Sequence, residues 1–445
     1  MVLDRRTQSP ACVLLLALIG VVGCGGNAPE ARPASDSGLS TVERLGKSIF
    51  FDRRLSLRGN QSCASCHAPE VGWTGDLSSI NAGSAVYEGS VAGLFSRRKP
   101  PAAAYAMAPV FHSEVEDDEP LFVGGLFWDG RATGERLGDP LAEQAQGPFV
   151  NPVEQALPDT GCVVYRVCAA TYPVSLESQF PGSCAIDWPA DTEAICHMPV
   201  GALLLKPHDR AASDRAYDRI ASAIAAYERS REVNPFSSKF DRYLAGAAVL
   251  SAEEQAGLEL FAGRGKCAAC HPIEKGPDGA APLLTDFTFD NLGIPRNPEN
   301  PWYRAAGNAA GLAWVDEGLG AFLLTRPEWR AAAAANIGKH KVPTLRNVER
   351  RPDRAFVKAY MHNGYFKTLY GLVHFYNTRD VKPVCGEPLT EREALERDCW
   401  PAPEVAATVN SEELGDLGLS QAEERAIVAF MGALSDGYEP AADPR

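Results

Sequence analysis

Two copies of a Cys-x-x-Cys-His pattern stand far apart in this 445-residue chain, at residues 63–67 and 267–271. Two thiols at this spacing add across the vinyl groups of one haem, and the adjacent imidazole then ligates the iron. A zinc knuckle, a redox dithiol and a disulfide are the alternatives, but two copies downstream of an export signal favour c-type haem. The sequence therefore predicts two covalently bound haem c groups. The expected attachment residues and iron ligands are Cys63, Cys66 and His67 for the first haem, and Cys267, Cys270 and His271 for the second.

The N-terminus has the pattern of a lipoprotein export signal. Basic residues precede an apolar stretch at residues 11–20, and small residues then lead to Cys24. This apolar run is too short for an ordinary transmembrane span. We expect residues 1–24 to be a signal peptide with Cys24 acylated after cleavage; a secretory peptide cut elsewhere is the alternative. Residues 25–40 would then be a flexible tether, and the protein would lie in the periplasm, touching the membrane only through its lipid.

The twelve cysteines divide into groups with different expected roles. Cys12 leaves with the signal peptide, Cys24 carries lipid and four cysteines hold haem. An even remainder of six in an oxidising compartment suggests three disulfides. Cys385 with Cys399 is the expected pair, because neither has another near neighbour, and the pairing of the other four stays open. These four are Cys162, Cys168, Cys184 and Cys196.

Composition narrows the class of partner. The formal net charge is −14, which argues against nucleic acid as a partner and suits either a basic partner or simple solubility. The length is sufficient for two or three domains with proper cores.

An internal repeat precedes the two haem motifs. Residues 46–50 and residues 257–261 each have the pattern of the end of a short helix, and Ser251 with Glu254 forms a capping box before the second. A helix, a loop and then Cys-x-x-Cys-His is how a small cytochrome c domain begins. The repeat therefore predicts two such domains, each with one haem.

The remaining helix signals place the domain boundary. Residues 212–231 have apolar side chains at helical spacing, and Asn234-Pro235 ends that pattern. A last helix opens with a capping box at Ser420 and extends to about Leu434. The expected fold is mainly α, with two cytochrome c-like domains, long loops and few short strands. The expected segments are 41–233 for the N-terminal domain with the peroxidatic haem, 234–437 for the C-terminal domain with the electron-transfer haem, and 438–445 for a tail.

Several motifs between and after the haem attachment sites carry a family resemblance. The chain resembles the bacterial dihaem cytochrome c peroxidases and their MauG relatives, in consistent order from about Gly46 to Leu434. The motifs are residues 127–131 (FWDGR), 143–154 (EQAQGPFVNPVE), 341–348 (KVPTLRNV), 360–364 (YMHNG) and 374–377 (HFYN).

The resemblance implies a peroxide site on the first haem. Cleavage of peroxide at a ferric haem needs an open distal face and a base that moves a proton between the two oxygens. Glu154 matches the distal glutamate of the family, and Gln144 and Pro148 would complete that pocket. A solvated carboxylate before a loop is the alternative reading of Glu154.

Trp128 matches the family tryptophan that lies between the two haems. An indole in that position can carry an electron between irons that are too far apart for fast direct transfer. Simple core packing is the alternative, and the two readings are compatible.

A missing histidine separates this chain from the reductively activated peroxidases. Those relatives hold a His on a loop after the first motif, which blocks the peroxidatic haem until the other haem is reduced. No His occurs here between His67 and His112, and Gly83 stands near the expected position. His112 adjoins an acidic loop and is expected to be exposed. The first haem is therefore expected to be five-coordinate, with no need for reductive activation.

Tyr376 is the expected sixth ligand of the second iron. The peroxidases place a Met fourteen residues after the His of their Tyr-Met-His segment, and the same count from His362 reaches Tyr376, where MauG-type members have Tyr. A phenolate lowers a haem potential, whereas thioether sulfur raises it. Met361 and His374 are nearby competitors, but His374 is two positions away and would point elsewhere on a helix. A buried core tyrosine is the alternative.

The calcium site of the family is in doubt. The resemblance implies an Asn in one ligand segment, where this chain has Lys99, and carbonyls in another, at residues 357–359. A cation at Lys99 could replace the charge of the ion.

The resemblance implies an oxidoreductase that reduces hydrogen peroxide to water. Electrons would come from a small c-type cytochrome or another periplasmic donor. The alternative is a MauG-like oxidase that modifies residues of a partner protein through a high-valent iron state. A non-enzymatic electron carrier is a third reading, but a carrier has no need of Glu154 beside an open site.

Overall fold

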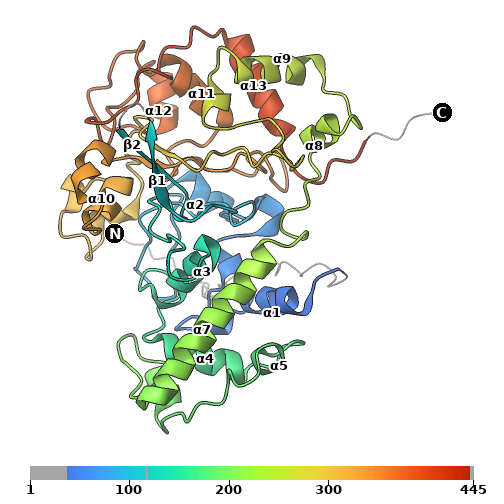
Figure 1. Ribbon diagram of the computed structural model, residues 1–445. Coiled ribbons are helices and arrows are strands. Elements are labelled where there is room, and N and C mark those ends of the chain that lie inside the picture. The colour runs from blue at the N-terminus through green and yellow to red at the C-terminus, as the bar shows by residue number, and fades with distance from the viewer. Residues whose placement is uncertain (1–37, 117–118, 441–445) are drawn as a thin grey trace, which may run out of the picture. The chain divides into compact units, whose positions relative to one another are not determined.

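The computed structural model describes residues 38–116 and 119–440, which belong to one compact unit. The expected signal peptide, with Cys12 and Cys24, and nearly all of the tether lie outside the described residues. The described residues form a mainly helical fold with two short two-stranded antiparallel sheets, as expected (Figure 1). None of the described helices combines the length and the apolar composition that a membrane crossing requires.

The N-terminal half, residues 38–233, consists of seven described helices and one hairpin. In the hairpin, His112 pairs with Val123, and β1 is exposed along its whole length. The elements are α1 (Thr41–Phe50), α2 (Ser78–Ala82), β1 (His112–Glu116), β2 (Glu119–Val123), α3 (Pro140–Val150), α4 (Thr160–Ala169), α5 (Leu176–Gln179), α6 (Thr192–Ile195) and α7 (Pro207–Glu228).

The C-terminal half, residues 234–440, has six described helices and one two-residue strand pair. The strands place Phe289 opposite Lys341. The elements are α8 (Lys239–Leu244), α9 (Ala252–Ala262), β3 (Phe289–Asp290), α10 (Gly318–Leu324), β4 (His340–Lys341), α11 (Leu369–Thr378), α12 (Glu391–Glu396) and α13 (Gln421–Gly432).

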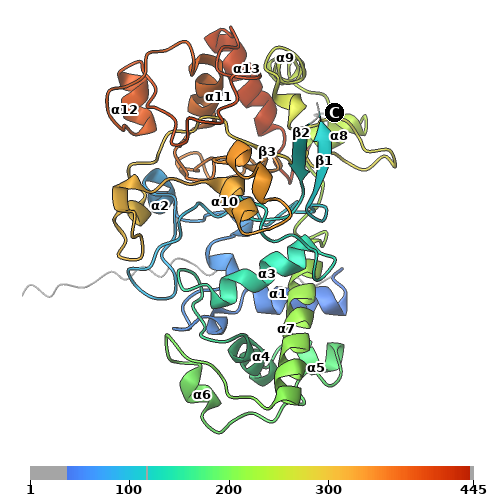
Figure 2. The same cartoon turned by 60° about the vertical axis from the view of Figure 1, so that its left-hand side comes forward.

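The internal repeat corresponds to two equivalent helix crossings. Gly46 of α1 lies so close to α7 that a methyl group there would overlap the carbonyl oxygen of Ala223. Gly257 of α9 meets α13 in the same way, at the carbonyl oxygen of Ala426. In Figures 1 and 2, α1 and α7 lie together, and α9 lies with α11 and α13 apart from them. Glycine is required at both crossings because any side chain would separate the helices.

An aromatic pair closes each crossing one turn further along. Phe50 meets Tyr227 edge-on with ring centroids 5.7 Å apart, and Phe261 meets Phe430 at 5.2 Å. All four rings are buried. The repeat in the sequence therefore corresponds to the same packing motif in both halves, each directly before a haem motif.

The expected helix ends agree closely with the structure. Ser251 and Ser420 both form capping boxes, at the starts of α9 and α13. The helix expected at residues 212–231 is α7, which begins earlier, at Pro207, and ends at Glu228. Proline fits the first helical turn, which is why the helix extends upstream of its apolar pattern.

Two main clusters of buried apolar side chains follow the two halves. One contains residues from Leu45 to Val233, and the other contains residues from Phe240 to Leu434. The change of cluster falls where the sequence predicts a domain boundary. The division into two cytochrome c-like domains stays a prediction, because the described residues form one compact unit.

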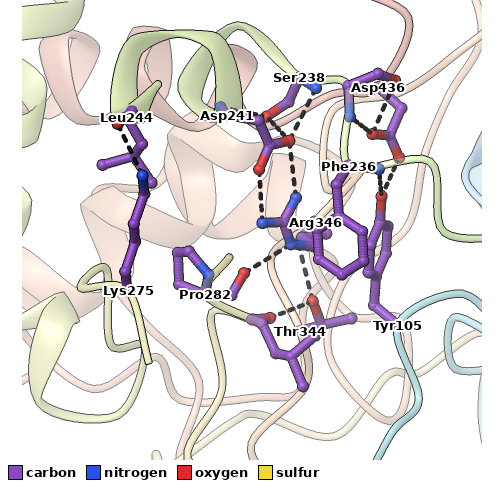
Figure 3. Close-up of polar contacts among 12 residues, drawn as sticks. Tyr105, Phe236, Ser238, Asp241, Leu244, Lys275, Pro282, Thr344, Arg346 and Asp436 are labelled. Atoms are coloured by element: carbon purple, nitrogen blue, oxygen red, sulfur yellow. Dashed lines mark hydrogen bonds and ion pairs between the residues drawn. The ribbon is translucent and has the colours of Figure 1, made fainter. Parts of the chain in front are cut away.

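A buried polar cluster around Arg346 joins the halves (Figure 3). The guanidinium donates to both carboxylate oxygens of Asp241, at 2.9 and 3.0 Å, and to the carbonyl of Pro282 at 2.7 Å. Tyr105 of the N-terminal half lies 4.8 Å from the guanidinium, and its hydroxyl donates to Asp436 at 2.7 Å. Because a buried arginine needs these partners, the segment ending at Arg346 is held firmly in place.

The six cysteines assigned to disulfides are all paired. Cys385 bonds to Cys399, which confirms the expected pair. The four that the sequence left open pair as Cys162–Cys196 and Cys168–Cys184, and they tie together the α4–α6 region.

Candidate functional site

A cavity in the N-terminal half gathers the residues expected around the first haem. They come from the first haem motif, the loop before residue 131, helix α3 and the turn after it. The predicted site residues that line it are Cys63, Cys66, His67, Trp128, Gln144, Pro148 and Glu154.

The first Cys-x-x-Cys-His segment is shaped for a metal-ligating imidazole. A 3-10 turn at Cys63–Ser65 is closed by the His67 amide, which donates to the Cys63 carbonyl at 3.0 Å. His67 Nδ1 lies 3.2 Å from the Trp73 carbonyl, which can only accept. Nδ1 therefore carries the proton, and Nε2 keeps a free lone pair. Burial lowers the His67 pKa to about 4, so the ring is neutral, as a ligand must be.

Glu154 lies in the same cavity on the turn that follows α3. Burial raises the pKa of its carboxyl, while Arg131 and a hydrogen bond with Asn151 oppose that rise. Pro148 lies in the last turn of α3, and its carbonyl accepts from the Gln155 amide at 3.1 Å. Carbonyls in the last turn of a helix have no partner within that helix, so this one is available to fix the turn that carries Glu154.

A second carboxyl group in this cavity was missed from the sequence. Glu228, the last residue of α7, lines the cavity and is 5% exposed, and its Oε2 has no hydrogen-bond partner among the described residues. Burial raises its pKa to about 8, so it is protonated at neutral pH. Ile224, four positions earlier, lines the same cavity. That spacing puts both on one helix face, which is the signal the sequence offered.

A second cavity, in the C-terminal half, contains the other haem motif. Its lining includes Cys267, Cys270, His271 and Tyr376. His271 Nδ1 lies 2.8 Å from the Leu284 carbonyl, and burial lowers the His271 pKa to about 4. This imidazole therefore also presents a free Nε2, in the same arrangement as His67.

Tyr376 and Met361 meet in this second cavity. The Tyr376 hydroxyl donates to Met361 Sδ at 3.6 Å, and both residues line the cavity. Burial raises the Tyr376 pKa. His374 turns away, and its Nδ1 lies 2.8 Å from a carboxylate oxygen of Glu424. The expectation that His374 points elsewhere is confirmed, and Met361 is the one competitor of Tyr376 that reaches the cavity.

Trp128 belongs to the wall between the cavities and lines both. Its Nε1 donates to the Lys99 carbonyl at 2.8 Å, and its own carbonyl accepts from the Lys341 amide at 2.8 Å. The neighbouring Asp129 carboxylate pairs with Arg98 and Arg131, each at 2.7 Å. The indole is therefore fixed at its ring nitrogen and at its backbone.

Comparison with known proteins agrees with this geometry. A family model described as di-haem cytochrome c peroxidase matches residues 40–249. Methylamine utilization protein MauG of Paracoccus denitrificans is 33% identical over 443 residues, which is 97% of this chain and 96% of that protein. The chain belongs to the dihaem cytochrome c peroxidase and MauG family.

Other members of the family support the same placement. Cytochrome-c peroxidase IdrP1 of Denitromonas iodatirespirans is 28% identical and covers 92% of this chain and 85% of that protein. The crystal structure of the diheme peroxidase BthA of Burkholderia thailandensis matches with a TM-score of 0.68 and 28% identity, over 91% of this chain and 88% of that one. The protein is thus an oxidoreductase of this family.

The two cavities fit the haem c groups that the dihaem family implies. Each offers two cysteines without a disulfide and the half-buried neutral imidazole of its own motif, whereas the six other described cysteines are all in disulfides. Burial raises the pKa of all four free thiols. Covalent haem attachment uses two free thiols for the bonds to the haem and a nearby imidazole nitrogen for the iron.

Neither His112 nor Gly83, which stands near the expected position of the family's blocking histidine, lines the first cavity. His112 is exposed on β1, where its ring contacts the Val110 carbonyl and Glu114. The Gly83 carbonyl accepts from Lys367 at 2.5 Å, away from the cavity lining. Of the described residues, His67 is the only histidine that lines the first cavity.

Three potential metal ligands that line the second cavity form a histidine stack and an ion pair instead. Asp316, His340 and His362 bring ligand atoms within 4.8 Å of one another. The two imidazole rings, however, stack at 3.6 Å with an interplanar angle of 8°. Lone pairs in parallel rings do not converge on one ion, and Arg98 already donates twice to Asp316 at 2.6 Å. The arrangement is that of a buried ion pair and stack.

Lysines occupy the segments in which the family's calcium ligands were expected. Lys99 and Lys358 are both buried. Lys358 Nζ donates at 2.6–2.9 Å to three backbone carbonyls, those of Val71, Asn347 and Arg350. The Lys358 amino group therefore already occupies three carbonyls in this region, and the doubt about the family's calcium stays a prediction.

Proposed function

We propose that the protein is a dihaem c-type peroxidase that reduces hydrogen peroxide to water with electrons from a small c-type cytochrome. One peroxide, two electrons and two protons give two molecules of water. The observation that carries the proposal is the first cavity, which combines a haem motif, Glu154 and no histidine other than His67 among the described lining residues. This supports activity without reductive activation.

Haem c would be held by Cys63, Cys66 and His67, and it supplies the redox-active iron at which a peroxide O–O bond breaks. The chain supplies proton transfer. The Glu154 carboxylate takes the proton from the near oxygen of hydrogen peroxide and returns it to the departing oxygen, which leaves as water. Burial raises the Glu228 pKa to about 8, so this carboxyl is mainly protonated at neutral pH and is a poorer base than Glu154.

Gln144 and Pro148 shape the same space. Gln144 offers an amide that can donate to a peroxide oxygen and accept from it. Pro148 presents an apolar face, and its carbonyl holds the turn that carries Glu154. The two residues therefore orient peroxide and the base relative to each other.

Electrons would reach the first cavity through the second. Trp128 lines both cavities, the position from which an indole passes an electron between them. We propose that the second haem c is held by Cys267 and Cys270, with His271 and Tyr376 as its iron ligands. The phenol of Tyr376 is the reason to expect a low potential there.

A MauG-like oxidase is the second candidate. Its support is Tyr376 in the second cavity and 33% identity to a MauG over nearly the whole chain. Such an enzyme would take the two electrons from side chains of a partner protein instead of from a cytochrome. The peroxide site would be the same in both cases.

Turnover with a small c-type cytochrome separates these candidates. Mixing the ferric protein with limiting hydrogen peroxide and excess reduced cytochrome should oxidise two cytochromes per peroxide over many cycles. Absorbance of the reduced cytochrome measures this, and a reaction with catalase added first is the control. Cytochrome oxidation no faster than without the protein would rule out the peroxidase proposal and leave the protein-modifying one.

We also propose an exported, periplasmic protein with a lipid at Cys24. Three disulfides among the described residues support an oxidising compartment. The haem motifs agree with this, because both cysteines of each motif stay free in the presence of those disulfides.

A further inference from the structure

Two lysines belong to the wall that separates the two cavities. Seven residues line both cavities, and Lys99 and Lys341 are the charged ones among them. The seven are Lys99, Pro101, Ala102, Trp128, Lys341, Pro343 and Thr344. The wall that contains Trp128 therefore also carries two lysines, one from before Trp128 in the sequence and one from after it.

Lys99 is buried without a carboxylate. It is 8% exposed, and its Nζ donates to Thr74 Oγ1 at 2.9 Å and to the Pro100 carbonyl at 3.0 Å. The charged group that acts on it most is another cation, Lys367, and its pKa is lowered to about 8 by burial and by that lysine. No ion pair of Lys99 occurs among the described residues.

Lys341, on the other side of the wall, is half-buried and makes no ion pair among the described residues. Its backbone amide holds Trp128, but its Nζ reaches only the Val342 carbonyl, at 3.4 Å, and lies 5.8 Å from the Phe287 ring centroid. Burial lowers its pKa to about 8, with Asp286 opposing that change. An enclosed ammonium group with such weak partners is unfavourable unless an anion joins it.

We propose that Lys99 and Lys341 pair with the propionate carboxylates of the two haem groups and thereby hold the potentials of both haems up together. The proposal rests on the two haems of the proposed function. Each haem carries two propionates, which are the anions that these cavities would receive. A positive charge beside a haem favours the reduced iron, because reduction adds an electron near that charge.

The shared wall gives this proposal a distinctive consequence. A lysine that lined one cavity would act on one haem, whereas a lysine in the common wall acts on both. Removing either charge should therefore lower both midpoint potentials. Lys99→Met and Lys341→Met remove the charge and keep most of the side-chain length, and the corresponding Arg variants keep the charge.

The test is spectroelectrochemical titration of the dihaem protein, after a haem assay has shown two haems per chain. Each Met variant should shift the reduction equilibrium of both haems by about tenfold toward ferric, which is ~59 mV per one-electron couple. The Arg variants should stay at the wild-type potentials. Lys382→Met, which removes a lysine that lines neither cavity, controls for net charge.

Unchanged potentials in fully loaded Met variants would overturn the proposal, as would equal shifts in the Met and Arg variants. If a Met variant does not bind both haems, resonance Raman spectra of the wild-type protein test the pairing of the lysines with the propionates instead. The propionate bending bands should show hydrogen-bonded carboxylates; bands of free carboxylates would contradict the pairing. If the Met variants show these potential shifts but the wild-type protein does not turn over peroxide, the proposed function is wrong and the pairing of the lysines with the propionates still holds.

Discussion

Replacing Glu154 with glutamine slows the reaction of the ferric protein with hydrogen peroxide by about 10²–10⁴-fold, the range that a positioned acid–base group contributes. Glutamine keeps the shape of the side chain but cannot take the proton from peroxide. The second-order rate constant from stopped-flow absorbance measures the effect. Haem content and ferric spectra should stay as in the wild type, because Glu154 is not expected to touch the iron.

The matched control for this variant is Glu228→Gln. Glu228 lines the same cavity, but it is already protonated at neutral pH, so its replacement should change the rate constant little. A large loss of rate in Glu228→Gln, with full activity in Glu154→Gln, would show that Glu228 is the base and Glu154 is not.

The pH dependence of the reaction with hydrogen peroxide is an independent test of Glu154 as the base. Because burial raises the Glu154 pKa, the reaction should lose rate as the pH falls through a value above that of an ordinary glutamate. The loss follows protonation of the base, and it should be absent from the small residual rate of the glutamine variant. A residual rate with the same pH dependence would point to another group.

Replacing Tyr376 with phenylalanine is expected to raise the potential of the second haem by about 100 mV or more, within the ~0.8 V range that axial ligands span. A phenolate stabilises ferric iron, and its loss removes that preference. The neighbouring Met361 sulfur, 3.6 Å from the Tyr376 hydroxyl, is then free to approach the iron and would raise the potential further. Spectroelectrochemistry of the variant measures the change.

Met361→Leu is the companion variant, because Met361 is the donor in the cavity that contacts Tyr376. With Tyr376 as the ligand, the potential and the ferric spectrum should stay close to those of the wild type. With Met361 as the ligand, the leucine variant would lose the sixth ligand and Tyr376→Phe would change little. The pair of variants therefore gives opposite results for the two ligands.

Much of this architecture is readable from the sequence because its signals are local. The two haem motifs, the capping boxes at Ser251 and Ser420 and the Cys385–Cys399 pair each depend on residues close together in the chain. The repeated glycines, Gly46 and Gly257, are a stronger case. They mark the two helix crossings that precede the haem motifs, although the carbonyls they contact lie far along the chain.

The features that the sequence did not reveal depend on distant contacts. Glu228 lies in the first cavity because α7 crosses α1, and its helix spacing alone does not say which face meets the cavity. Lys341 was visible only as part of a motif, and the weak contact of its Nζ with the Val342 carbonyl appears only in the folded structure. The Cys162–Cys196 and Cys168–Cys184 pairs likewise depend on how α4 and the chain after it fold back.

The most direct test of the central claim is rapid mixing of the fully ferric protein with one equivalent of hydrogen peroxide, without any reductant. If the first haem site is open, as the lining of the first cavity predicts, the haem spectrum should change at once and peroxide should be consumed. If instead the protein stays silent until its second haem is reduced, a sixth ligand blocks the first iron. That result would contradict a peroxidase that is ready to react as it is made.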